Sequence, residues 1–114
     1  MENDVPKHLY DIQEAASSIF QFVGGKFFDD YKRDELLRSG VERKLEIIGE
    51  ALNRLKRDNP AVLEQIREYR SIISFRNVLA HGYDTIDDRI VWDILEEGLR
   101  ELFEDVVELI DEEV

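Results

Sequence analysis

The spacing of apolar residues constrains this chain most strongly, because apolar positions recur every three or four residues along almost its whole length. That period matches one face of an α-helix. No two-residue turn is flanked by alternating β-branched runs, so the sequence gives no strand signal. The pattern therefore predicts an all-α fold.

Residues that start and stop helices divide the pattern into segments. A first helix is expected from about Asp4 to Gly24, and a second from near Asp34 to Asn59. Asn59 and Pro60 form an N-cap followed by a first-turn proline, which predicts the start of a third helix. The first two helices are expected to bury Leu9, Ile12, Ala16, Ile19 and Val23, and Val41, Leu45, Ile48, Leu52 and Leu55.

The third helix is expected to bend near residues 71–74 and to end around His81 and Gly82. Thr85, with Asp88 three residues on, is expected to cap a fourth helix as a variant of the capping box. These two helices are expected to bury Leu63, Ile66, Ile73 and Leu79, and Val91, Leu95, Leu99, Leu102, Val106 and Leu109.

Four amphipathic helices with short connections predict one domain over residues 1–114, an antiparallel bundle of four or five helices. A bundle of this size buries only about two thirds of its unfolded surface, which favours burying more as a homodimer. The fourth helix supports this with a second apolar set: Ile90, Ile94, Phe103, Val107 and Ile110.

The composition excludes several classes of protein. The absence of cysteine removes disulfide frameworks, thiolate zinc sites and cysteine nucleophiles. No apolar run approaches the roughly 18 residues of a membrane span and no signal peptide begins the chain, so we expect a cytoplasmic protein with no membrane contact. The acidic run at 87–97 has no histidine at ligand spacing, and no glycine-rich phosphate loop is present. We therefore expect no metal site and no cofactor.

The charge of the chain is unevenly distributed. A net charge of −12 disfavours a protein whose main task is to coat nucleic acid. Residues 54–76, however, carry six basic and three acidic side chains. This basic segment is either a local anion site or the ordinary charged surface of helices.

The most informative stretch is residues 74–84, which places Arg76, Asn77 and His81 just before Gly82. Asn77 and His81 are four residues apart and share a helix face. Arg76 and His81 lie about 140° apart on an ideal helix, so they converge only if the helix end relaxes or a second copy contributes.

Arginine, histidine and an amide can cleave a phosphodiester without a metal. Histidine can move the proton of a ribose 2′-hydroxyl or of the leaving oxygen, and arginine can stabilise charge on the phosphoryl oxygens. From spacing alone, His81 and Arg76 can equally be a helix C-cap and a surface ion pair.

The string Arg76-Asn77-Val78-Leu79-Ala80-His81-Gly82-Tyr83 resembles the R-x4-H-x-Y signature of HEPN-domain ribonucleases, specifically the HepT-like toxins. Residues 41–52 are similar to the long helix before the motif in that family, and Tyr83, Ile86, Val91 and Trp92 fit its following helix. The resemblance covers nearly the whole chain and is weakest over residues 1–35.

The resemblance implies a homodimeric HEPN-type bundle with two motifs lining one cleft, and metal-independent cleavage of RNA. It makes Arg76 and His81 catalytic and Asn77 a supporting group. It also implies a partner, a nucleotidyltransferase antitoxin that uses ATP to attach AMP to Tyr83. AMP adds bulk and negative charge at a site that binds a phosphate backbone.

Other residues carry weaker expectations. Arg67 and Arg70 either line a track for RNA or pair with nearby glutamates. Trp92 is expected to pack, and His8 is expected on the surface. Gly49 lies inside a helix, where glycine costs roughly 1 kcal/mol against alanine, and is expected to allow a close helix approach. We assign no chemistry to its neighbour Glu50.

Two functions from different classes remain. The first is the ribonuclease toxin of a toxin–antitoxin pair, favoured by the intact set Arg76, His81 and Tyr83. The second is a HEPN protein without catalysis that binds a nucleotidyltransferase, favoured by the net charge of −12. Both functions predict a dimer.

Overall fold

The computed structural model of the chain describes residues 4–80 and 86–113. Within these two stretches every regular element is helical, which confirms the predicted all-α class. The elements are α1 (Val5–Val23), α2 (Phe28–Arg33), α3 (Glu35–Asp58), α4 (Pro60–Leu63), α5 (Tyr69–Ala80), α6 (Asp88–Asp93), the π-helical turn η1 (Ile94–Gly98) and α7 (Leu99–Glu113).

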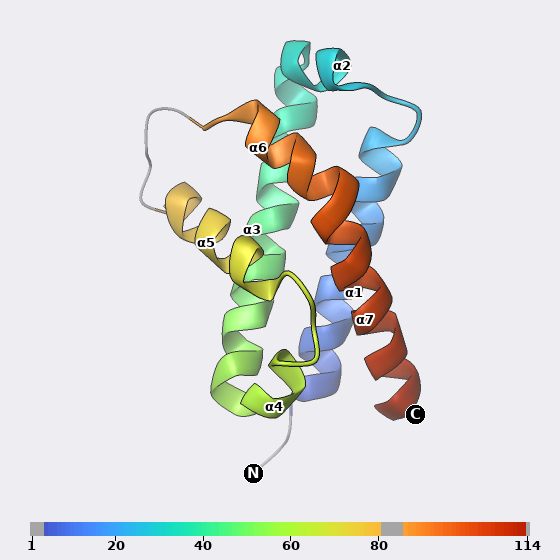
Figure 1. The fold of residues 1–114 in the computed structure, drawn as a ribbon, viewed down its shortest axis with the longest axis vertical. Coiled ribbons are helices and arrows are strands. Elements are labelled where there is room, and N and C mark those ends of the chain that lie inside the picture. The colour runs from blue at the N-terminus through green and yellow to red at the C-terminus, as the bar shows by residue number, and fades with distance from the viewer. Residues whose placement is uncertain (1–3, 81–85, 114) are drawn as a thin grey trace.

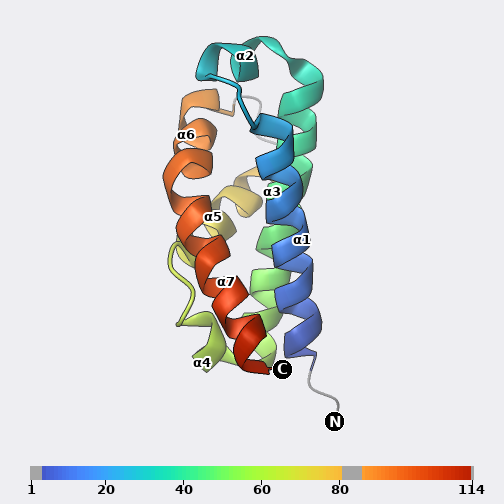
Figure 2. The same cartoon turned by 90° about the vertical axis from the view of Figure 1, so that its right-hand side faces the viewer.

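Three long helices run along the length of the molecule. α1 packs against both α3 and α7, and α5 lies obliquely across α3 (Figure 1). The short α2 crosses one end of the bundle, and α4 lies at the opposite end, near the start of α1 and the end of α7 (Figure 2). None of the described helices is long and apolar enough to cross a membrane.

The core lies where the sequence places it in α1, α3 and the last helical segment. All the apolar positions predicted for α3 and for the segment from α6 to α7 are buried, as are those of α1 except Val23, which is half-buried. Trp92 is buried and packs against Tyr31, with 5.4 Å between the ring centroids, which confirms its expected packing role.

Helix α2 was not predicted from the sequence. The Asp30 carboxylate accepts a hydrogen bond of 2.8 Å from the backbone N–H of Phe27, which closes the first turn of α2. Tyr31 anchors the helix, because its fully buried ring packs on Trp92. These six residues are too few for an apolar repeat, so the tertiary contact of Tyr31 decides that α2 forms.

The predicted third helix is broken in two. Asn59 does cap its start, since its side chain accepts from the Val62 N–H at 3.3 Å, but α4 ends at Leu63. The predicted bend at 71–74 is wrong, because the chain turns before α5 and Glu68 takes a left-handed φ of 68°. As a result α5 buries Ile72 and Phe75, while the predicted Ile73 and Leu79 are only half-buried.

The predicted start of the fourth helix is also wrong. Helix α6 begins at Asp88, and its cap is Asp87, whose carboxylate accepts from the Arg89 N–H at 2.9 Å. Aspartate is at least as good an N-cap as threonine, so the helix can begin after Asp87. Thr85 lies outside the described residues. The π-helical turn η1 then connects α6 to α7 without breaking the buried stripe.

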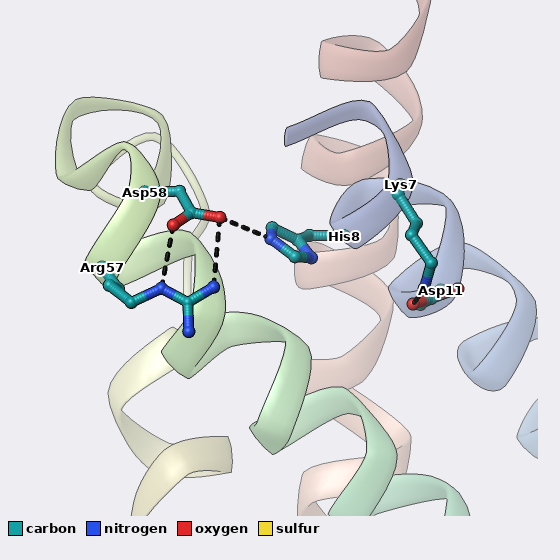
Figure 3. Close-up of polar contacts among 5 residues, drawn as sticks. All are labelled: Lys7, His8, Asp11, Arg57 and Asp58. Atoms are coloured by element: carbon teal, nitrogen blue, oxygen red, sulfur yellow. Dashed lines mark hydrogen bonds and ion pairs between the residues drawn. The ribbon is translucent and has the colours of Figure 1, made fainter. Parts of the chain in front are cut away.

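His8 is buried rather than on the surface, which corrects the sequence-based expectation. Its side chain is 5% exposed, and Nε2 lies 2.8 Å from a carboxylate oxygen of Asp58 at the end of α3. Arg57 holds the same carboxylate through two hydrogen bonds, whereas the Lys7–Asp11 pair lies apart from this contact (Figure 3). The antiparallel packing of α1 on α3 brings these residues together across 50 positions of sequence.

This contact changes the acidity of Asp58. Hydrogen bonds from Arg57 and then from His8 lower the pKa of Asp58 to about 2. The pair therefore ties the start of α1 to the end of α3 through an ionised carboxylate. It lies at the end of the bundle that holds α4 (Figure 1).

Candidate active site

The first part of the candidate motif, residues 76–80, lies on α5, whose buried face is set by Ile72 and Phe75. This face packs on α3 at Gly49. A Cβ at Gly49 would lie 2.5 Å from the Cβ of Arg76 and 3.5 Å from the carbonyl oxygen of Ile72. The predicted close approach at Gly49 is therefore confirmed, and the residue that fills the space is Arg76.

Arg76 combines a buried stem with an accessible end. Its side chain is 31% exposed, but Nε is buried and has no hydrogen-bond partner. Nη2 lies 4.0 Å from Oε1 of Glu50 on α3, which is an ion pair beyond hydrogen-bonding distance. The guanidinium therefore keeps donors available for an incoming anion.

The rest of the motif is described only in part. Asn77 is exposed on α5. His81 and Tyr83 lie outside the described residues, so the structure does not test their predicted roles. What the structure adds to the motif is Glu50, to which the sequence assigned no chemistry.

Arg67, a candidate for RNA contact, is engaged by carboxylates of α7. Its backbone N–H and its Nε donate to the same Asp105 oxygen, at 2.9 Å and 3.0 Å. Nη2 donates to the other Asp105 oxygen at 3.1 Å, and Glu104 and Glu101 lie within 3.5 Å and 3.9 Å. These bonds lower the pKa of Asp105, chiefly through the side chain of Arg67. The positive charge of Arg67 is thus largely neutralised within the chain.

Arg70, the second candidate for RNA contact, is much freer. Its side chain is 77% exposed and lies 3.9 Å from a Glu64 carboxylate oxygen, without a hydrogen bond. The guanidinium carbon stands 4.7 Å from the centre of the Tyr69 ring. The Tyr69 hydroxyl in turn donates to Glu64 at 2.6 Å. Arg70 is therefore available to solvent on α5, six residues before Arg76.

A groove of about 280 Å³ borders α5 on the side of α6 and η1. Its floor includes the apolar Ile72, Ile90 and Ile94. Its rim carries the acidic residues Glu68, Asp93, Glu97 and Glu101. Four carboxylates repel a phosphate backbone, so this groove does not favour an anionic ligand. Among the described residues no group of three or more histidine and carboxylate side chains is arranged to hold a metal ion.

A second group of polar residues lies where α2, α3 and α6 meet. Burial, followed by the charge of Asp88, raises the pKa of Glu42 above its ordinary value. Burial also raises the pKa of Tyr31, whose hydroxyl is buried and has no hydrogen-bond partner. This group could not be predicted from the sequence, because its members come from three separate helices.

Comparisons with known proteins agree with the motif. A family model described as "Ribonuclease HepT-like" matches residues 12–109. A Methanocaldococcus jannaschii protein named "Putative RNase MJ1380" is 30% identical over 92% of this chain and 95% of its own length. The "Probable ribonuclease HepT" of Thermococcus cleftensis is 31% identical over 90% of this chain and 92% of its own length. No solved structure matches the chain significantly.

Proposed function

The chain belongs to the HepT-like ribonuclease family, and we propose that it is the metal-independent endoribonuclease toxin of a toxin–antitoxin pair. Membership of this family makes it a ribonuclease. The observation that carries the finer proposal is Arg76, a half-buried arginine with donors left free, five residues before His81 in the sequence. Arginine donors that stabilise phosphoryl oxygens and a histidine that moves protons can together cleave a phosphodiester without a metal.

The proposed reaction uses the 2′-hydroxyl of the RNA as nucleophile. His81 takes the proton of that hydroxyl, and the oxygen attacks the adjacent phosphorus. The bond from phosphorus to the 5′-oxygen breaks, and the departing oxygen takes a proton from a protonated histidine. The products are a 2′,3′-cyclic phosphate and a 5′-hydroxyl. Arg76 stabilises the negative charge that grows on the phosphoryl oxygens, where preorganised donors have their largest effect.

We propose that the active form is a homodimer. Arg76 and His81 point about 140° apart on an ideal helix, so a second copy that presents its own motif supplies the missing group to one phosphate. Two histidines also divide the roles of base and acid. Ile90, which is 56% exposed beside the groove along α5, offers apolar surface that a second copy can bury.

The proposed antitoxin is a nucleotidyltransferase that transfers AMP from ATP to Tyr83. The Tyr83 oxygen attacks the α-phosphorus of ATP, and pyrophosphate leaves. Tyr83 is two residues after His81 in the sequence, so the added phosphate brings negative charge close to the catalytic groups. RNA is then excluded by bulk and by charge repulsion. We also propose that both partners act in the cytoplasm.

Cleavage of RNA by the purified protein tests the catalytic proposal. The wild type is expected to cleave single-stranded RNA in EDTA, and His81→Ala is expected to lose cleavage while the fold and dimer mass stay unchanged. A wild type that needs added magnesium, or a His81→Ala variant with full activity, contradicts the metal-free mechanism.

The intact mass of the protein after incubation with the nucleotidyltransferase encoded beside it, together with ATP, tests the proposed switch. We expect a gain in steps of one AMP that disappears in Tyr83→Phe, and a Tyr83→Phe protein that remains toxic in the presence of the antitoxin. Unchanged mass in the wild type contradicts modification and indicates inhibition by binding.

One observation favours the second function, a binding partner without catalysis. Arg67 is neutralised by Asp105 and its neighbours, so the basic segment offers RNA less positive charge than its composition indicates. A protein of this kind binds the nucleotidyltransferase but leaves RNA intact at any salt concentration. Cleavage that falls steeply as salt rises favours the ribonuclease instead.

A further inference from the structure

The crossing of α3 and α5 depends on one atom being absent. Gly49 lies inside α3, and a Cβ there would approach the Cβ and Cγ of Arg76 to 2.5 Å and 2.7 Å. The position of the Arg76 Cβ is fixed by the α5 backbone, so this atom cannot move aside by a change of rotamer. α5 can therefore lie at this depth on α3 only while residue 49 has no side chain.

We propose that Gly49 and Glu50 are positioning residues for Arg76: Gly49 sets the depth at which α5 seats the arginine, and Glu50 orients its guanidinium. This inference rests on the proposed function, in which Arg76 contacts the scissile phosphate. Neither α3 residue is expected to touch RNA. Both act through Arg76, and they are adjacent in the sequence, so one turn of α3 fixes both ends of the catalytic side chain.

The stem of Arg76 is held by packing alone. Nε is buried at this crossing and has no acceptor, which is unfavourable for a buried donor. Such a cost is tolerated where the group serves a function. The Arg76 side chain is 31% exposed, although its Nε is buried. A phosphate can therefore reach the guanidinium only through its other two nitrogens.

The end of Arg76 is held by charge without being saturated. Glu50 Oε1 lies 4.0 Å from Nη2, close enough for attraction but too far for a hydrogen bond. A hydrogen-bonded carboxylate, like that of Asp105 on Arg67, would occupy the donors that a phosphate needs. Glu50 instead biases the orientation of the guanidinium and leaves its donors open. Orientation before binding lowers the barrier of the chemical step.

The variant Gly49→Ala tests whether the close packing of Arg76 on Gly49 matters for catalysis, and Gly40→Ala is the matched control. Both glycines lie in α3, but a Cβ at Gly40 meets only the Phe22 ring, at 3.4 Å, which is ordinary contact. In a helix interior alanine is otherwise more favourable than glycine. We expect kcat for RNA cleavage to fall at least tenfold in Gly49→Ala and to stay within twofold of wild type in Gly40→Ala. A folded Gly49→Ala protein with wild-type kcat overturns the inference.

Glu50→Gln tests the orientation and keeps the inference falsifiable if Gly49→Ala fails to fold. The control is Glu46→Gln, which removes the same charge one turn earlier on α3, where Glu46 pairs with Arg43 at 2.6 Å. We expect kcat to fall about threefold to tenfold in Glu50→Gln with KM nearly unchanged. In Glu46→Gln both kcat and KM should stay at their wild-type values. A positioning role acts on kcat, because it matters in the transition state.

The opposite result has a distinct meaning. If Glu50 merely competes with phosphate for Arg76, Glu50→Gln lowers KM and leaves kcat equal or higher, and the inference is overturned. If both constants stay at the wild-type values, it is overturned as well.

Failure of the proposed function is separately recognisable. In that case the wild type itself leaves RNA intact, or Arg76→Ala cleaves as fast as wild type. Where the wild type cleaves and Arg76→Ala does not, an unaffected Glu50→Gln refutes only the positioning role of α3. Cleavage by the wild type and by Arg76→Ala should therefore be measured before the variants of α3.

Discussion

Two arginines of the same basic segment, Arg67 and Arg76, have opposite surroundings. Arg67 lies before α5 and donates hydrogen bonds to both oxygens of Asp105 on α7. Arg76 lies within α5, where one carboxylate stands 4.0 Å away and a glycine leaves room for its stem. The first arginine connects α7 to the start of α5, and the second is a cation whose only carboxylate contact among the described residues lies beyond hydrogen-bonding distance. Neighbours, not residue type, separate the two roles.

Replacing each arginine by alanine should produce the largest contrast. We expect Arg76→Ala to lose about 3 kcal/mol of transition-state stabilisation, roughly 100-fold in kcat/KM, as when one oxyanion contact is removed. Arg67→Ala should retain kcat/KM within about threefold when measured on folded protein. Steady-state cleavage of a labelled RNA in EDTA gives both values.

The contrast fails in two distinguishable ways. If Arg76→Ala raises KM and leaves kcat unchanged, Arg76 binds RNA without stabilising the transition state. If Arg67→Ala loses as much as Arg76→Ala, the ion pairs of Arg67 do not keep it from the substrate. Circular dichroism on both variants confirms that the comparison is between folded proteins.

Asp105→Ala should mainly affect stability. Asp105 is 15% exposed and accepts from the backbone N–H as well as the side chain of Arg67. Its loss removes the acceptor of the backbone N–H and the Nε of Arg67, and leaves, among the described residues, only Glu101 and Glu104 near the guanidinium. This should cost about 1 kcal/mol, or about 4 °C in Tm. Asp11→Ala is the control, because the exposed Lys7–Asp11 pair is of the kind worth little. Equal Tm values for the two variants, measured by thermal unfolding, contradict a stabilising role for Asp105.

The sequence predicted the helices whose apolar stripe is long and missed what depends on one distant contact. α1, α3 and the segment ending in α7 follow their periodicity. The break at Glu68 was not predicted, because a non-glycine residue with φ of 68° carries no local signal. α2 was missed for a related reason, since the contact of Tyr31 with Trp92 decides it.

The candidate site shows the same division. The sequence motif singled out Arg76 as a candidate, and Gly49 inside its helix correctly indicated a close helix approach. The sequence did not show that Arg76 is the residue that packs on Gly49. His8 had a usable signal, since it lies four residues before the buried Ile12 on the same helix face. Its partner Asp58 is 50 positions away, so the pairing itself required the fold.

Replacing Arg70 should weaken RNA binding more than replacing Arg67, but this difference should be smaller than the difference in kcat/KM between the Arg76 and Arg67 variants. Its side chain is 77% exposed, with its nearest carboxylate at 3.9 Å. If Arg70 contacts one phosphate, Arg70→Ala should weaken binding a few-fold and reduce the slope of log K against log salt by about 0.7. Arg67→Ala should leave that slope unchanged. Binding can be titrated in the His81→Ala background, which keeps RNA intact. A slope unchanged by Arg70→Ala removes Arg70 from the RNA track.

The smallest effect should appear in the pH dependence of stability. Hydrogen bonds from Arg67 hold the pKa of Asp105 below its ordinary value, so the ionised form stabilises the fold. That stabilisation is complete above the pKa of the carboxyl in the unfolded chain, near 4, and is lost as the pH falls through the lower pKa of the folded state. Asp105→Asn lacks this titration, so its stability deficit relative to wild type should be constant from pH 7 to about 5 and shrink below pH 4.

Asp58 supplies the control for this measurement. Its pKa, about 2, is lowered by Arg57 and His8 at the end of the bundle that holds α4, independently of Arg67. Both proteins keep that carboxylate, so the loss of stability that it causes in acid cancels in their difference. Urea unfolding of wild type and Asp105→Asn at a series of pH values gives the difference directly. A deficit that stays constant down to pH 3 means that the Arg67 pair is uncoupled from protonation. The hydrogen bonds of Asp105 would then stabilise the fold whether or not its carboxyl is ionised. Asp105 would offset less of the positive potential of Arg67 than the contacts between them indicate, and more of that potential would be available to a ligand.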